Sequence, residues 1–198
     1  MSKSVSPTFN SLQQFISDYV SQKFNITEGF MTGNQAAWFE AFLQKTPQIK
    51  SILEIGFNGG FSSGVFLNTR PDIKVLSVDL GAHDYVLPAK TWIDKKFPNR
   101  HLLLIGDSTN VLPRIPQHIR EADCIFIDGG HLGTIPHQDI TNTLLHCRPD
   151  AWIVIDDYAP YAPDVVKAVD EHLKSHKLHG VLQGNDTQRG WIVVKKIC

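Results

Sequence analysis

The sequence lacks the features that would place it in several specialised classes of protein. Its three cysteines are an odd number without metal-ligand spacing, which argues against a disulfide framework. Its formal net charge of −1 provides no basic surface for nucleic acid. No apolar run approaches a membrane span, and the N-terminus MSKSVSPTF lacks a signal-peptide core. These absences favour a cytoplasmic protein that acts on a small molecule, with neither nucleic acid nor membrane as a partner.

Linkers, internal repeats and low-complexity segments are also missing from the 198 residues. A chain of this length can bury a large core without disulfides or structural metals. We therefore expect one globular unit over residues 33–198, preceded at residues 1–32 by a helix and a lid segment. Nothing in the composition fixes the oligomeric state, and a homodimer stays open.

What the chain does contain is a regular alternation of short apolar runs with helical stretches. The expected strands are 51–56, 73–79, 101–107, 123–128 and 152–157, and the expected helices between and after them are 60–69, 86–97, 109–120, 134–147 and 161–177. Strands of this kind without in/out alternation indicate a parallel sheet that is covered on both faces. Right-handed crossovers then make the fold α/β, Rossmann-like and doubly wound.

The two ends of the chain add further elements. Residues 178–184 and 189–196 flank a turn too short for a crossover helix, so they predict an antiparallel hairpin at the sheet edge and seven strands in all. Before the sheet, helical spacing from Phe9 to Val20 predicts one amphipathic helix, and a capping-box pattern from Thr32 to Gln35 opens a second. These helices form an expected N-terminal cap, with GFMTGN (29–34) between them as the lid.

Aspartates follow four successive strands of the expected sheet. They are Asp79, Asp107, Asp128 and the adjacent pair Asp156 and Asp157. One such aspartate is usually a helix cap, but parallel strands bring all their carboxyl ends to one edge, where ligands of open α/β sheets bind. The adjacent pair is the most unusual feature, because buried carboxylates are costly unless they are paired, hydrogen-bonded or bound to a metal.

A glycine-rich turn follows the first strand in the stretch EIGFNGGFS. Together with Asp79 at the end of the second strand, this turn is typical of a nucleoside-binding site, in which an acid accepts hydrogen bonds from ribose hydroxyls. The turn reads G-x-x-G-G from Gly56 and lacks the glycine placed for a pyrophosphate. This spacing favours S-adenosylmethionine over a dinucleotide, without deciding between them.

At these motifs the chain resembles the class I S-adenosylmethionine-dependent methyltransferases over residues 33–196. LEIGFNGGFSS is similar to the first motif of that family, especially in its catechol O-methyltransferase form. The resemblance implies that Asp79 holds the ribose of the cofactor, and that Asp107 and Ser108 flank its adenine. It also implies that the turn residues surround the methionine part. These are Glu54, Gly56, Gly60 and Ser62, and Asn58 of the same turn is a further candidate cofactor contact.

FIDGGH followed by VIDDY resembles the metal-dependent O-methyltransferases of the catechol, caffeoyl-CoA and macrocin-type sugar classes. By that resemblance Asp128, Asp156 and Asp157 would bind Mg²⁺, a hard cation that takes oxygen ligands and would offset the repulsion among three carboxylates. The catechol type has a lysine as general base where this chain has His131, and the sugar type has an acid where it has Gly130. His131 is then a candidate base, with a contact to the cofactor or a helix cap as the alternative.

The expected activity is transfer of a methyl group from S-adenosylmethionine to a hydroxyl of a small molecule, assisted by Mg²⁺. Three alternatives remain open on the sequence. They are a metal-independent methyltransferase of the same fold, a nicotinamide-dependent oxidoreductase, and a module that binds the cofactor without catalysis.

Overall fold

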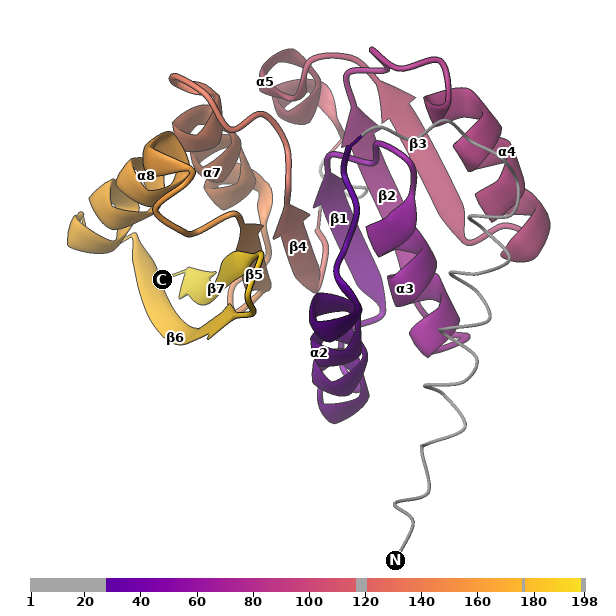
Figure 1. The fold of residues 1–198 in the computed structure, drawn as a ribbon, viewed down its shortest axis with the longest axis horizontal. Coiled ribbons are helices and arrows are strands. Elements are labelled where there is room, and N and C mark those ends of the chain that lie inside the picture. Colours follow the sequence, from indigo (N-terminus) through magenta and orange to yellow (C-terminus); the bar gives the residue numbers. More distant parts are fainter. Residues whose placement is uncertain (1–27, 117–120, 176, 197–198) are drawn as a thin grey trace, which may run out of the picture.

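The structure is a computed structural model that describes residues 28–116, 121–175 and 177–196. Seven strands form one sheet in the order β3-β2-β1-β4-β5-β7-β6. The strands are β1 (Ser51–Ile55), β2 (Lys74–Asp79), β3 (His101–Ile105), β4 (Cys124–Ile127), β5 (Trp152–Asp156), β6 (Leu178–Asn185) and β7 (Gly190–Lys196). β1 to β5 are parallel, and the strand order reverses between β1 and β4. The predicted Rossmann-like sheet is confirmed (Figure 1).

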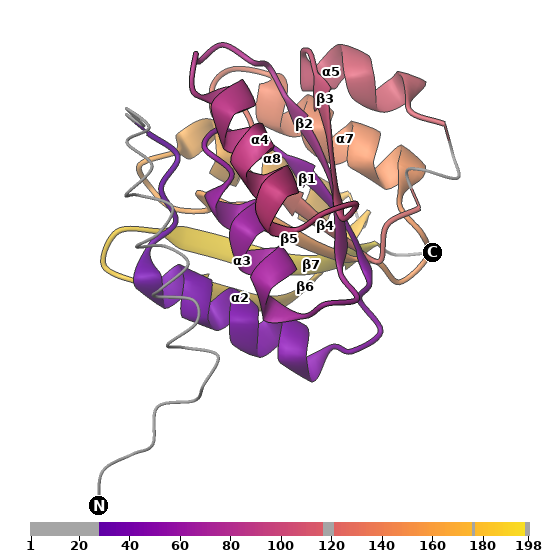
Figure 2. The ribbon, with the colours of Figure 1, turned by 90° about the vertical axis from the view of Figure 1, so that its right-hand side faces the viewer.

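Helices cover both faces of the sheet (Figure 2). One face packs against α2 (Gly33–Lys45), α3 (Phe61–Thr69) and α4 (Val86–Lys96). The other packs against the 3-10 helix η1 (Leu112–Arg114), α7 (Ile135–His146) and α8 (Pro163–Lys174), with the short α5 (Ser108–Val111) beside α7. Each face has its own cluster of buried apolar residues, as a doubly wound fold requires.

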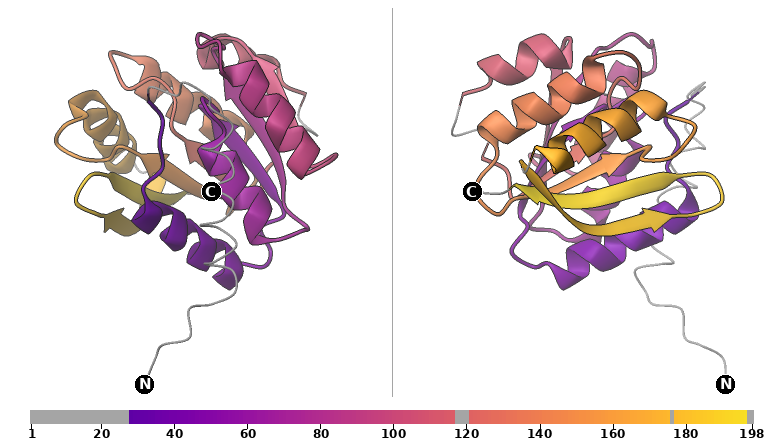
Figure 3. Two further views of the ribbon diagram at one scale, coloured as in Figure 1. Left: turned by 45° about the vertical axis from the view of Figure 1, so that its right-hand side comes forward. Right: turned by 90° about the vertical axis from the view of Figure 1, so that its left-hand side faces the viewer.

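The C-terminal hairpin forms the edge of the sheet next to β5. β7 pairs antiparallel with β5, and β6 lies outside it (Figure 3). The antiparallel hairpin is as predicted, and its turn lies at the same edge of the sheet as the carboxyl ends of the parallel strands, because Asp156 pairs with Trp191. In the described residues, no helix is long and apolar enough to cross a membrane.

Two helical predictions fare differently. The expected helix 109–120 is confirmed only as far as Arg114, because α5 and η1 end there and Ile115 is extended; residues 117–120 lie outside the described residues. Pro116 accounts for this end, since a residue before proline avoids helical backbone angles. The expected amphipathic helix from Phe9 to Val20 lies outside the described residues.

Only one of the two hydrogen bonds of the predicted capping box is present at the start of α2. The Thr32 hydroxyl accepts a hydrogen bond from the Gln35 backbone N–H at 3.1 Å, as a cap should. The Gln35 side chain, however, does not serve the cap: it is buried, and its amide donates to Asp156 Oδ1 at 2.7 Å. A residue chosen as a helix-capping signal is therefore a contact to one of the strand-end carboxylates.

Glu54 lies beneath the turn that follows β1, in a buried polar network. Its carboxylate accepts hydrogen bonds of 2.5 Å from the hydroxyls of Ser62, Ser63 and Ser77, and His101 Nε2 lies 2.8 Å from the Ser77 oxygen. Burial raises the pKa of Glu54 from 4.5 to about 7, although the three hydroxyls oppose the shift. The network joins β1, β2, β3 and the first turn of α3.

The Glu54→Gln variant keeps the shape of this side chain and removes its titration. Because the pKa is higher in the folded state, the protonated form stabilises the fold, fully below the unfolded value of 4.5, and this contribution is lost as pH rises through about 7. Wild type should therefore lose roughly 3 kcal/mol of unfolding free energy relative to the variant between pH 4.5 and pH 8. Urea unfolding at pH 5 and 8 measures this. If the unfolding free energies of wild type and variant differ by the same amount at pH 5 and at pH 8, the pKa of Glu54 is not raised and the group is ionised at both pH values.

Candidate active site

A cavity of about 350 Å³ lies at the carboxyl ends of β1, β2, β3 and β4. Its position is the point where the strand order reverses, which is the usual ligand site of open α/β sheets. Larger hollows of about 690 and 660 Å³ lie beside α8 and α2, away from this point. Six predicted site residues line the cavity, namely Gly56, Asn58, Asp79, Asp107, Ser108 and Asp128. Glu54, Gly60 and Ser62 do not line it: Glu54 and Ser62 are buried below the turn, and Gly60 is the N-cap of α3.

The turn after β1 forms one wall of the cavity. Gly56 has a φ of 94°, and a Cβ at this position would come within 1.9 Å of the Asp128 carbonyl oxygen, so only glycine lets the ends of β1 and β4 approach this closely. Asp79 holds the next part of the turn, because its Oδ2 accepts hydrogen bonds from the backbone N–H groups of Phe57 at 2.9 Å and Asn58 at 2.7 Å. Asp79 therefore joins the end of β2 to the turn.

The far end of the cavity is lined by the start of α5. Asp107 is the N-cap of this helix, and its Oδ1 accepts hydrogen bonds from the backbone N–H and the hydroxyl of Thr109. These bonds lower the pKa of Asp107. Ser108 also faces the cavity and donates to Asp139 of α7 at 2.7 Å. Two apolar side chains complete this end, Leu80 and Ile135, which are 65% and 38% exposed.

Asp128, His131 and Asp157 form a second feature, the carboxylate cluster, next to the cavity. The ligand-type atoms of these three residues lie within 4.8 Å of one another, an arrangement that could hold a metal ion. His131 Nε2 lies 2.9 Å from Asp157 Oδ2 and 3.4 Å from Asp128 Oδ1. Hydrogen bonds to these two carboxylates raise the pKa of His131 to about 10, so the imidazole is protonated at neutral pH.

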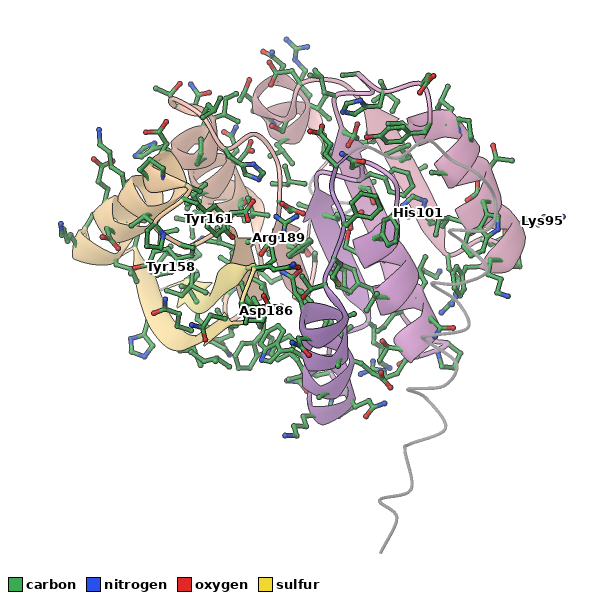
Figure 4. All side chains as sticks on the ribbon, in the orientation of Figure 1. Lys95, His101, Tyr158, Tyr161, Asp186 and Arg189 are labelled. Carbon is green, nitrogen blue, oxygen red and sulfur yellow. The ribbon has the colours of Figure 1, made fainter. Side chains whose placement is uncertain are left out.

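Asp157 has more partners than its neighbours. Its Oδ1 accepts hydrogen bonds from Arg189 Nη1 at 2.9 Å and from the Tyr161 hydroxyl at 2.7 Å. Figure 4 labels the side chains of these two donors. Burial opposes ionisation, but the bonds from His131 and Tyr161 and the nearby cations outweigh it, so the pKa of Asp157 falls to about 2. Arg189, from the hairpin turn, thus compensates the charge of the second aspartate.

Asp156, the third predicted ligand, lies beside the carboxylate cluster and is not one of its three residues. It is 4% exposed, and its Oδ1 is held by Gln35 of α2. Burial, followed by repulsion from Asp128 and Asp157, raises its pKa well above the ordinary value. The next residue, Asp157, has a left-handed φ of 55°. The predicted role of Asp156 as a metal ligand stays a prediction.

Residues 28–32 cross this edge of the sheet above the two features. Glu28 pairs with His83 at 2.6 Å beside the cavity, and the Phe30 ring lies 5.2 Å from that of Phe61. At the other end, the Phe30 carbonyl accepts a hydrogen bond from Arg189 at 3.1 Å, and the Thr32 hydroxyl donates to Asp186 of the hairpin turn. These contacts place the segment where a lid would lie, and its function as a lid stays a prediction.

Comparison with known proteins identifies the family. The family model of a methyltransferase domain matches residues 53–158, more than half of the chain. A search of curated proteins found no match.

Solved structures share the fold over most of the chain. The O-methyltransferase from Bacillus cereus in complex with SAH (S-adenosylhomocysteine) has a TM-score of 0.75 and 17% identity, covering 98% of this chain and 94% of that one. SAH-bound methyltransferase PaMTH1 from Podospora anserina has a TM-score of 0.75 and 16% identity, covering 100% and 91%. MycE methyltransferase from the mycinamycin biosynthetic pathway, in complex with Mg and SAH, has a TM-score of 0.62 and 18% identity, covering 93% and 55%. The protein therefore belongs to the methyltransferase-domain family and has the fold of the class I S-adenosylmethionine-dependent enzymes.

Proposed function

We propose that this protein transfers the methyl group of S-adenosylmethionine to a hydroxyl oxygen of a small molecule. The observation that carries the proposal is the adjacency of two features at one sheet edge. The cavity has the glycine turn and the acid that a nucleoside requires, and the carboxylate cluster beside it has a histidine that can exchange a proton. Binding without catalysis would need the first feature alone.

The cofactor would lie along the cavity with its ribose at Asp79 and its methionine part toward Gly56 and Asn58. Leu80 and Ile135 would offer apolar contacts to the faces of the adenine, next to Ser108. Glu54, Gly60 and Ser62 would then act without touching the cofactor, by supporting the turn from below.

The residues of the carboxylate cluster fit a divalent cation. Asp128 Oδ1 and Asp157 Oδ2 are the kind of hard oxygen donor that Mg²⁺ prefers, and one or two carboxylates with water commonly suffice. Arg189 and Tyr161 hold the other oxygen of Asp157, which would fix its orientation, as outer partners of metal ligands do. We therefore propose Asp128 and Asp157 as ligands of Mg²⁺, with Asp156 held aside by Gln35.

His131 would be the general base of the reaction. The acceptor O–H proton would move to Nε2, the acceptor oxygen would attack the methyl carbon, and the carbon–sulfur electron pair would stay with sulfur. A cation bound at Asp128 and Asp157 would attract the acceptor oxygen and favour its deprotonated form. His131 must be neutral to act as a base. A cation bound by Asp128 and Asp157 would weaken their interaction with the imidazole and so lower the pKa of His131.

A second candidate is a methyltransferase that needs no metal. It is favoured by the contacts of Asp157, whose charge is compensated by Arg189 and His131 from within the chain. In that case the cluster would position the acceptor through the side chains alone.

The assignment of Asp79 to the ribose predicts a loss of cofactor affinity in the Asp79→Ala variant. Loss of a charge-assisted acceptor should weaken S-adenosylhomocysteine binding by roughly 1.5–3 kcal/mol, measured by calorimetry. Asp79→Asn keeps the shape and tests the charge, while Asp72→Ala, an acid paired with Arg70 outside the cavity, is the control. Unchanged affinity in both Asp79 variants, with melting temperatures near that of wild type, would exclude this role.

The metal proposal predicts that Mg²⁺ lowers the pKa of His131. The NMR signals of the imidazole should titrate near pH 10 in the metal-free protein, because Asp128 and Asp157 stabilise its protonated form. Mg²⁺ would compete for these carboxylates and move the midpoint toward the ordinary value of about 6.5.

Asp128→Asn removes one charged ligand and should weaken this response, whereas Asp150→Asn is a matched control at the opposite edge of the sheet. Asp150 is exposed and has a left-handed φ of 65°, which asparagine tolerates. If millimolar Mg²⁺ leaves the titration of His131 unchanged, the metal-independent candidate is the correct one.

A further inference from the structure

Asp139 of α7 is a buried carboxylate behind the far end of the cavity. It is 0% exposed, and its Oδ1 accepts the hydrogen bond from the Ser108 hydroxyl at 2.7 Å. Its Oδ2 has no hydrogen-bond partner among the described residues. Ser108 is therefore the one hydroxyl donor that the described structure gives to this carboxylate.

The carboxylate has little room to turn away from Ser108. A Cβ at Gly129 would come within 2.9 Å of Oδ2, so the loop after β4 closes over this oxygen. On the other side, α5 and α7 pack against each other (Figures 1 and 2). Burial raises the pKa of Asp139 to about 6. At pH 8 the group is therefore ionised, has no proton of its own to donate, and can only accept hydrogen bonds.

The bond to Asp139 determines what Ser108 can offer to a ligand. A serine hydroxyl has one proton to donate and two lone pairs that accept. If the proton turned toward the cavity, the buried carboxylate would lose its donor, which is unfavourable. Ser108 is one of the residues that line the cavity. With its proton held by Asp139, its hydroxyl would be an acceptor for any ligand group that reaches it there.

We propose that Asp139 is a positioning residue that sets the base specificity of the cavity, by fixing the Ser108 hydroxyl as an acceptor for the 6-amino group of adenine. A hypoxanthine base has an oxo group at that position, and two acceptors would then face each other. This inference rests on the proposed function, since it requires the adenine of the cofactor to lie at this end of the cavity.

The test compares two ligands by calorimetry at pH 8: S-adenosylhomocysteine, and its analogue with hypoxanthine in place of adenine. Wild type should prefer the adenine ligand by roughly 10- to 100-fold, the cost of leaving an acceptor unsatisfied. In Asp139→Asn the amide can donate to the Ser108 oxygen, which frees the hydroxyl proton to face the cavity. The preference should then fall to within about 3-fold.

Ser108→Ala removes the same hydrogen bond between Ser108 and Asp139 from its other side and leaves the buried carboxylate in place. It should also reduce the preference, and the double variant should add nothing to it, because the two residues act through one hydrogen bond. Asp170→Asn is the matched control: Asp170 accepts a hydrogen bond from the Tyr158 hydroxyl at 2.9 Å, outside the cavity, and its loss should leave the preference unchanged.

The outcomes separate the inference from the proposed function. If wild type binds S-adenosylhomocysteine and both Asp139→Asn and Ser108→Ala retain the full preference for adenine, the inference is overturned while the cofactor assignment stands. If wild type binds neither ligand, the proposed function fails and the inference fails with it.

Discussion

The charge compensation of Asp157 is the interaction on which the rest of the site depends. One carboxylate from the end of β5 is bonded to His131 from the loop after β4 and to Arg189 from the hairpin turn. Arg189 in turn donates to the carbonyl of Phe30, in the segment that crosses the sheet edge. The ion pairs are largely buried at Asp157, where removal of one partner costs far more than at the surface. Asp157 therefore joins the loop after β4 to the hairpin turn, and through Arg189 it is connected to the segment that crosses the sheet edge.

Much of this architecture follows from local patterns. The apolar runs from β1 to β5 and the short turn of the hairpin predicted all seven strands, because a strand covered on both faces has few alternatives at that length. The topology then brought Asp79, Asp107 and Asp128 to one cavity without knowledge of any side-chain contact. Parallel strands share one carboxyl edge, so residues that follow them must gather there.

The parts that the sequence could not predict are contacts between elements. Gln35, Arg189 and Asp139 come from a helix, a turn and another helix, and their partners lie 121, 32 and 31 residues away. Nothing in the pattern around them differs from an ordinary surface or capping residue. The adjacent aspartates show the same limit, because two identical side chains have different partners: Gln35 for Asp156, and Arg189 and Tyr161 for Asp157, whose backbone is left-handed. Backbone angles of this kind arise from packing, and the residue types alone do not encode them.

The antiparallel β7 has a consequence for the two ends of the described chain. Glu28, the first described residue, lines the cavity, whereas β7 runs back from the hairpin turn and reaches the opposite edge of the sheet at Lys196. Glu28 and the cavity thus share one edge of the sheet, and Lys196 lies at the other. A bulky side chain introduced at Glu28 would compete with ligands for the cavity, while one introduced at Lys196 would lie a full strand length away from it.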